Sequence, residues 1–85
     1  MKYLLFEAPS WCQPCKAFAP VIDKLSQQIP IEKVDIDLNR ERAVLYSIRS
    51  VPTLVLIGDD GREITRLGGV QPAERVISVY NQHKK

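Results

Sequence analysis

Two cysteines, Cys12 and Cys15, are the residues of this 85-residue chain whose type and spacing best suit chemistry. They stand three positions apart in the segment Trp11-Cys12-Gln13-Pro14-Cys15-Lys16. A disulfide between them would close a very short loop and stabilise the fold little, because the entropy removed from the unfolded chain grows with loop length. This spacing is more typical of redox or metal chemistry than of a structural crosslink.

Two plainer interpretations of the cysteine pair compete with a redox role. Structural zinc is usually held by four cysteine or histidine ligands, and the only further residue of these types is His83, near the C-terminal end. The other interpretation is chance spacing of two core cysteines. We predict no metal and no bound cofactor, so that the thiols themselves are the redox centre.

The cysteine pair lies where a predicted strand meets a predicted helix. Lys2–Phe6 is a short apolar run typical of a buried strand. Gln13–Ile29 has apolar residues at helical spacing, with an expected kink at Pro20. At the helix N-terminus, free N–H groups and the helix dipole should lower the pKa of the Cys12 thiol from its usual value of about 8.5. Cys15 is one turn further on, so Cys12 could attack a substrate disulfide and Cys15 could resolve the mixed disulfide.

The rest of the chain predicts five further elements, which complete the order β-α-β-α-β-β-α. The first is a strand over Ile31–Leu38 with Val34, Ile36 and Leu38 on one face, and the second is a helix over Arg40–Ile48 with Val44, Leu45 and Ile48 inside. Two strands follow, over Thr53–Ile57 and Glu63–Leu67, joined by a turn at Gly58–Gly61. The last element is a helix after Pro72, whose apolar stripe consists of Ala73, Val76, Ile77 and Tyr80. The first two strands should be parallel, and the last two should form an antiparallel hairpin.

Composition limits the classes of protein to consider. Hydrophobic residues make up 45% of the chain and charged residues 26%, which is typical of one globular domain spanning residues 1–85. The net charge of +2 is too small to indicate nucleic acid binding. The apolar run at the N-terminus is too short for a signal peptide or a membrane span, so we expect a cytoplasmic protein that does not bind membranes. A monomer is the favoured oligomeric state.

Several segments together resemble the thioredoxin superfamily over nearly the whole chain. The segment from Ala8 to Lys16 resembles the active site, which usually has Gly at the position of Gln13. Pro20 matches a helix-kinking proline, and Lys33–Asp37 resembles the strand after the first helix. Ile48-Arg49-Ser50-Val51-Pro52-Thr53 resembles the cis-proline loop, and Gly68 matches a glycine of the substrate groove.

The resemblance implies a minimal thioredoxin fold of the α/β class, with a four-stranded mixed sheet and helices on both faces. The implied strand order is second, first, third, fourth. The first and third helices should share one face of the sheet, and the second helix should cover the other.

The resemblance also implies an enzyme that reduces protein disulfides, with Cys12 as the nucleophile and Cys15 as the resolving thiol. Pro52 would be cis and face the cysteines, and the backbone of Val51 would pair with an extended substrate. The implied groove residues are Trp11, Gln13, Pro14, Val51, Pro52 and Gly68. Lys16 would support the thiolate or be a solvated charge. Electrons would come from an NADPH-dependent thioredoxin reductase. Ribonucleotide reductase is a substrate that the family resemblance suggests, without a residue of this chain that indicates it.

The chain also departs from the thioredoxin pattern. It starts after the family's first strand and helix. Phe6 aligns with the Asp that thioredoxins bury beneath the cysteines, which leaves the supporting Lys33 without an obvious partner. Glu7 is one residue out of register and is expected on the opposite face of the strand.

Two alternative functions stay open. A Gly-Gly pair such as Gly68-Gly69 near the last helix is also a glutaredoxin feature, where it helps to hold glutathione. Some thioredoxins, on the other hand, are binding subunits of larger assemblies and do not use their thiols.

Overall fold

The computed structural model describes residues 1–84 and contains the seven predicted elements in the predicted order. They are β1 (Lys2–Glu7), α1 (Gln13–Leu25), β2 (Ile31–Asp35), α2 (Arg40–Leu45), β3 (Thr53–Ile57), β4 (Glu63–Gly68) and α3 (Ala73–His83). Within these residues, no helix is both long enough and apolar enough to cross a membrane.

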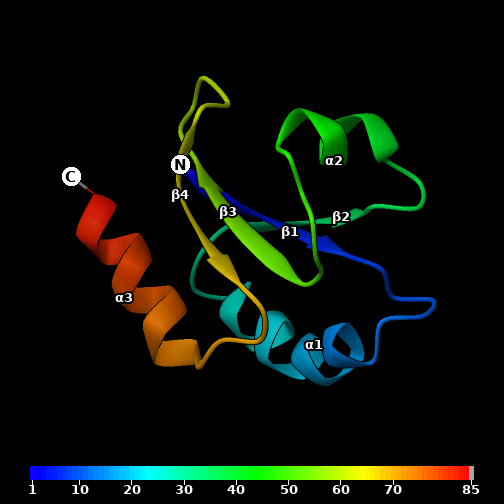
Figure 1. Ribbon diagram of the computed structural model, residues 1–85. Coiled ribbons are helices and arrows are strands. Elements are labelled where there is room, and N and C mark those ends of the chain that lie inside the picture. Colours follow the sequence, from blue (N-terminus) through cyan, green and yellow to red (C-terminus); the bar gives the residue numbers. More distant parts are fainter. Residues whose placement is uncertain (85) are drawn as a thin grey trace.

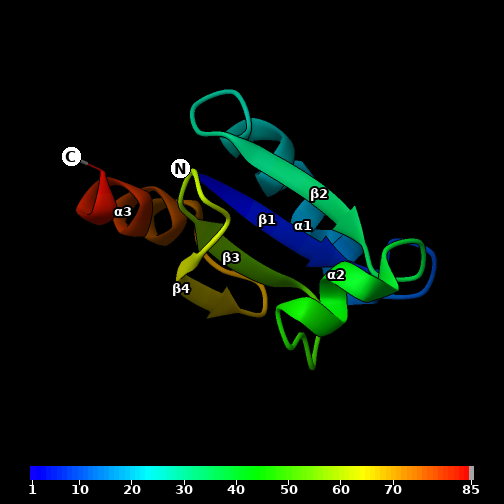
Figure 2. The same ribbon diagram turned by 90° about the horizontal axis from the view of Figure 1, so that it is seen from above.

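The four strands form one mixed sheet in the order β2-β1-β3-β4 (Figure 2). β1 pairs in parallel with β2 and antiparallel with β3, and β3 pairs antiparallel with β4. The strand order and directions that the family resemblance implied are therefore confirmed. β1 and β3 lie inside the sheet, and the residues between the charged ends of β1 and most residues of β3 are apolar, because both faces of these strands are covered.

Helices cover both faces of the sheet, as predicted (Figure 1). Tyr3 and Leu5 of β1 pack with residues of α1 and α3 on one face. Leu4 and Phe6 point to the other face, where partly buried residues of the α2 segment cover them. The period-two alternation of a strand explains this division.

Three predicted elements, α1, β2 and α2, end earlier in the chain than expected. α1 ends at Leu25 instead of Ile29, and the backbone then forms turns. β2 ends at Asp35 instead of Leu38, because the Asp35 side chain and carbonyl accept hydrogen bonds from the backbone N–H groups of residues 37, 38 and 39. The chain turns there, and Leu38, which was expected on the inner face, is 81% exposed.

The prediction for α2 was wrong at its end and for two of its three inner residues, and correct for Ile48. The helix ends at Leu45, and Val44 and Leu45 are exposed instead of buried. Ser47 adopts the left-handed conformation, with φ 53°, and the N–H of Ile48 donates to the carbonyl of Ala43 over 2.9 Å. This Schellman-type ending turns the chain, so the inner residues are Ala43, Tyr46 and Ile48.

Candidate active site

Cys12 is the N-cap residue of α1. A tight turn precedes it, in which the backbone N–H groups of Trp11 and Cys12 both donate to the carbonyl of Ala8, over 3.2 and 2.9 Å. The N–H of Cys15 donates to Cys12 Sγ over 3.2 Å. The Cys12 sulfur therefore takes the position where helices usually have a capping oxygen, and it faces the N–H groups that favour an anion.

Cys12 and Cys15 form a disulfide with a Cα–Cα distance of 5.2 Å. Both cysteines are buried, and they pack with Ala8, Ile36 and Val51. Pro14 occupies the first turn of α1, where a missing N–H costs no helical hydrogen bond. Gln13 and Pro14 are exposed beside the disulfide.

The loop before β3 closes over Cys12. The Val51–Pro52 peptide bond is cis, and the carbonyl oxygen of Val51 lies 3.8 Å from Cys12 Sγ. Pro52 is buried, and its carbonyl accepts a 2.8 Å hydrogen bond from the N–H of Gly69. Gly68 pairs with Thr53 at the end of β4, so the structure brings the predicted loop residues Val51, Pro52 and Gly68 to one place.

Trp11 stands beside the disulfide with 59% of its surface exposed. Its Nε1 donates a 3.0 Å hydrogen bond to Asp37, whose carboxylate also accepts a 3.4 Å bond from Ser10. Sequence reasoning missed Asp37, because it placed this residue within the second strand. The early end of β2 is what turns Asp37 toward the active-site loop.

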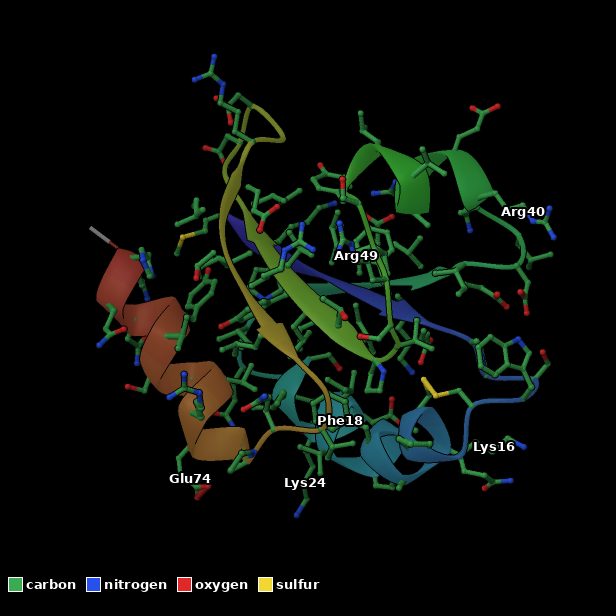
Figure 3. All side chains as sticks on the ribbon, in the orientation of Figure 1. Lys16, Phe18, Lys24, Arg40, Arg49 and Glu74 are labelled. Atoms are coloured by element: carbon green, nitrogen blue, oxygen red, sulfur yellow. A yellow bond between two sulfur atoms is a disulfide. The ribbon has the colours of Figure 1, made fainter. Side chains whose placement is uncertain are left out.

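Lys16 and Lys33 differ in their surroundings. Lys16 is exposed on the first turn of α1, close to the disulfide that Figure 3 shows in yellow. Lys33 was expected without an obvious partner, but its Nζ lies 2.9 Å from Asp23 of α1. This ion pair places Lys33 on the α1 side of the sheet.

Glu7, and not Phe6, lies on the sheet face that α1 covers, which corrects the expectation from the alignment. Phe6 packs against Tyr46 on the α2 face, with ring centroids 5.6 Å apart. Glu7 follows Tyr3 and Leu5 on the α1 face, and it is only 8% exposed. Because neighbouring strand residues point to opposite faces, the acidic residue on the α1 face is residue 7 and not residue 6.

The surroundings of Glu7 disfavour its charged form. Burial is the main cause that raises the pKa of Glu7, and the Lys33 ammonium opposes this effect. The carboxylates of Asp35 and Asp23 add to the rise in pKa. A protonatable group therefore lies beneath the helix that carries Cys15.

The zinc interpretation lacks ligands in the structure. Within residues 1–84, no three His, Cys, Asp or Glu side chains gather so that they could hold a metal ion. His83 is in the last turn of α3, where its Nδ1 lies 2.9 Å from the carbonyl of Val79.

Comparison with known proteins gives consistent results. The family model described as Thioredoxin matches residues 3–82. A thioredoxin from Bacillus subtilis is 39% identical over 82 residues, which cover 92% of this chain and 77% of that protein. A thioredoxin from Chlamydia trachomatis is 39% identical over 77 residues, covering 87% of this chain and 74% of the relative.

Solved structures agree with the sequence matches. A mutant thioredoxin from Halobacterium salinarum superposes with a TM-score of 0.87 and 32% identity, over 98% of this chain and 74% of the other. Thioredoxin from Fasciola hepatica gives a TM-score of 0.84 and 34% identity, over 96% of this chain and 79% of the other.

Proposed function

Because this chain belongs to the thioredoxin family and is a thiol–disulfide oxidoreductase, we propose that Cys12 is its nucleophile and Cys15 its resolving thiol. The observation that carries this assignment is the position of Cys12 Sγ at the N-terminus of α1, where it accepts the Cys15 N–H. A thiolate at Cys12 keeps this hydrogen bond, whereas Cys15 is inside the helix. Lys16 adds a positive charge on the same turn.

The reaction proceeds in two exchanges. The Cys12 thiolate attacks one sulfur of a substrate disulfide, and the other substrate sulfur leaves as a thiolate. Cys15 then loses its proton and attacks Cys12 Sγ, which re-forms the Cys12–Cys15 disulfide and releases the second substrate thiol. The protein dithiol thus supplies both electrons that reduce the substrate.

We propose that Glu7, the one buried acidic side chain among residues 1–84, takes the proton from Cys15. It is buried on the α1 face of β1, and its raised pKa brings it closer to the range in which a carboxylate can accept a proton from a thiol. Lys33 faces Glu7 but is already paired with Asp23, so its charge compensates that of Glu7 only in part. Glu7 then takes the role that the family assigns to its buried Asp.

The loop around Val51 is suited to bind an extended substrate segment. Val51 lies outside the strands, and its carbonyl is within 3.8 Å of the reactive sulfur. A substrate that pairs with this backbone would present its cysteine to Cys12. Trp11, Gln13 and Pro14, which are exposed, border one side of the disulfide, and Pro52 and Gly68 lie on the other side.

Thioredoxin reductase is the proposed electron donor, and disulfide-containing proteins of the cytoplasm, including ribonucleotide reductase, are the proposed substrates of a monomer. Family membership and Trp11 beside Cys12 support this choice over glutathione. The test is reduction of insulin disulfides with NADPH and thioredoxin reductase, in parallel with NADPH, glutathione reductase and glutathione. Turnover with the first system alone is the expected result. Turnover only with glutathione would make the chain a glutaredoxin.

A control separates redox work from a binding role. Replacement of both Cys12 and Cys15 by Ser removes the dithiol and leaves the remaining surface unchanged. We expect this variant to lose all insulin reduction. If a cellular function survived the double replacement, the chain would act as a binding subunit.

A further inference from the structure

An apolar groove of about 330 Å³ opens beside the cysteine pair. It shares Trp11 and Val51 with the site described above, and its other lining residues are Ile36, Ala43, Ile48, Arg49 and Ser50. Four of these residues are half-buried and apolar, and the indole of Trp11 is exposed at the edge. A side chain that enters this groove therefore leaves water for an apolar surface.

The ending of α2 builds one wall of the groove. The left-handed conformation of Ser47 turns the chain, and the hydrogen bond from the N–H of Ile48 to the carbonyl of Ala43 holds the two residues together. The hydrogen bond between Trp11 and Asp37 fixes the indole on the opposite side. The groove is thus formed by structure that is already in place before a ligand binds.

Arg49 gives the groove its charge. It is the only charged residue among the seven that line it, and its side chain is exposed. Within residues 1–84, Arg49 makes no ion pair with an acidic side chain. Asp37 does not line the groove but lies beyond the indole of Trp11. Its carboxylate already accepts hydrogen bonds from Ser10 and Trp11. Figure 3 shows Arg49 on the connection between α2 and β3.

We propose that this groove selects substrates whose reactive cysteine is flanked by bulky apolar residues and then by an acidic residue. The apolar side chain would fill the space between Trp11 and Ile48, and the carboxylate would face the unpaired guanidinium of Arg49. This inference rests on the proposed function, since it assumes that the substrate cysteine binds at Cys12.

The test uses short peptides whose single cysteine is blocked as a disulfide with 5-thio-2-nitrobenzoate. Cys12 thiolate attacks the peptide sulfur, the bond between the peptide sulfur and the aryl sulfur breaks, and the aryl thiolate leaves with the bonding electrons. Its absorbance reports the rate. The aryl thiol is the more acidic of the two and is therefore the better leaving group. Cys15 then releases the peptide thiol, so the pre-reduced protein supplies both electrons.

The peptides are symmetric about the cysteine, so that the result does not depend on the direction in which they bind. Two Leu residues stand on each side, followed by Glu, Gln or Lys at both capped ends, and a fourth peptide has Ala in place of Leu and Glu at the ends. We expect the Glu peptide to react about threefold faster than the Gln peptide, and the Lys peptide to react slowest, as an exposed ion pair allows. The Leu peptide should exceed its Ala counterpart by about five- to tenfold.

Variants locate the preference. Arg49→Gln should remove the difference between the Glu and Gln peptides, and Arg49→Lys should keep most of it. Arg75→Gln is the matched control, because Arg75 is also exposed and makes no ion pair within residues 1–84, but lies on α3, away from the active-site loop (Figures 1 and 2). It changes the net charge equally and should leave the ranking intact. Ala43→Leu, which fills the groove, should reduce the advantage of Leu over Ala.

Two results would overturn the inference while leaving the proposed function in place. One is equal rates for the Glu and Lys peptides with the unmodified protein, and the other is an unchanged preference in Arg49→Gln. Failure of the unmodified protein to release the aryl thiol from any peptide would instead overturn the proposed function, and the inference with it.

Discussion

Replacement of Glu7 by Gln should make the protein more stable and less active. Glu7 is 8% exposed, and at neutral pH its carboxylate faces one ammonium group that is already shared with Asp23. Gln has nearly the same shape but no charge. The variant removes the cost of burying a charge with incomplete compensation, for which we expect a gain of about 1–2 kcal/mol in the free energy of unfolding at pH 8. A gain of 1 kcal/mol corresponds to an increase of roughly 4–8 °C in the melting temperature of a domain of this size.

The gain should depend on pH, with a sign that follows from the raised pKa of Glu7. The folded protein holds the proton on Glu7 more tightly than the unfolded chain, in which the pKa of Glu7 is near its ordinary value of 4.5. The penalty for burial is therefore absent below this value and is fully present above the folded pKa. The difference in the free energy of unfolding between the variant and the unmodified protein should therefore grow as the pH rises from the unfolded pKa of Glu7 to its folded pKa.

Urea unfolding at pH 4 and at pH 8 measures the effect on stability, and insulin reduction measures the effect on activity. Activity should fall by about 10- to 100-fold, which is at or below the lower limit of typical general acid–base contributions, because a thiol loses its proton more easily than most groups. Glu74→Gln is the control, because Glu74 is exposed in the first turn of α3, where loss of its charge should slightly lower stability. Equal gains at pH 4 and pH 8, or undiminished activity, would refute the role assigned to Glu7.

Three further predictions concern the fold. Glu32 bridges Lys2 and Arg42, and its hydrogen bonds to Arg42 and Lys2 lower its pKa to about 2. Glu32→Gln should lower the free energy of unfolding by only about 0.5 kcal/mol at pH 7, because the carboxylate is partly exposed and screened by solvent. In urea unfolding, the difference between the variant and the unmodified protein should disappear as the pH falls from 4.5 toward 2. Ser47→Gly should raise stability by about 0.5–1 kcal/mol, because glycine adopts a φ of 53° without strain, and a lower melting temperature would contradict the Schellman-type ending. Tyr3→Phe should lower stability by about 1–2 kcal/mol in calorimetry, because the buried carbonyl of α3 that now accepts the 2.8 Å bond from the Tyr3 hydroxyl would lose its side-chain partner.

The sequence was sufficient for the element order and for the cysteine site, because these depend on local patterns. The apolar runs of β1 and β3 and the helical spacing in α1 are strong signals, and the segment from Trp11 to Lys16 lies at the junction that they define. The element ends were less accessible. Asp35 ends β2 because its side chain accepts a hydrogen bond from the backbone N–H of Asp37. Such a bond competes with the hydrogen bonds between strands, and the alternation of apolar and polar residues does not reveal it.

The sequence could not predict which face of a short element a residue occupies, or which residues far apart in the chain contact each other. α2 has only six residues, too few for helical spacing to fix its buried face, so Val44 and Leu45 were placed inside although they are exposed. The alignment placed Phe6 at the acidic position beneath the cysteines, but Glu7 lies on that face, and a register error of one residue is enough to reverse the face assigned to a strand residue. The bond between Trp11 and Asp37 joins segments that are 26 residues apart, and no local pattern indicates it.

The most direct test of the account is which cysteine captures a substrate. Reduced Cys15→Ser protein is mixed with oxidised insulin, and the covalent adduct is located by mass spectrometry. Because Cys12 attacks and no resolving thiol is left, the account predicts a stable mixed disulfide at Cys12, and no comparable adduct with Cys12→Ser. An adduct that forms at Cys15 in Cys12→Ser as readily as at Cys12 in Cys15→Ser would contradict the assignment of Cys12 at the helix N-terminus as the nucleophile.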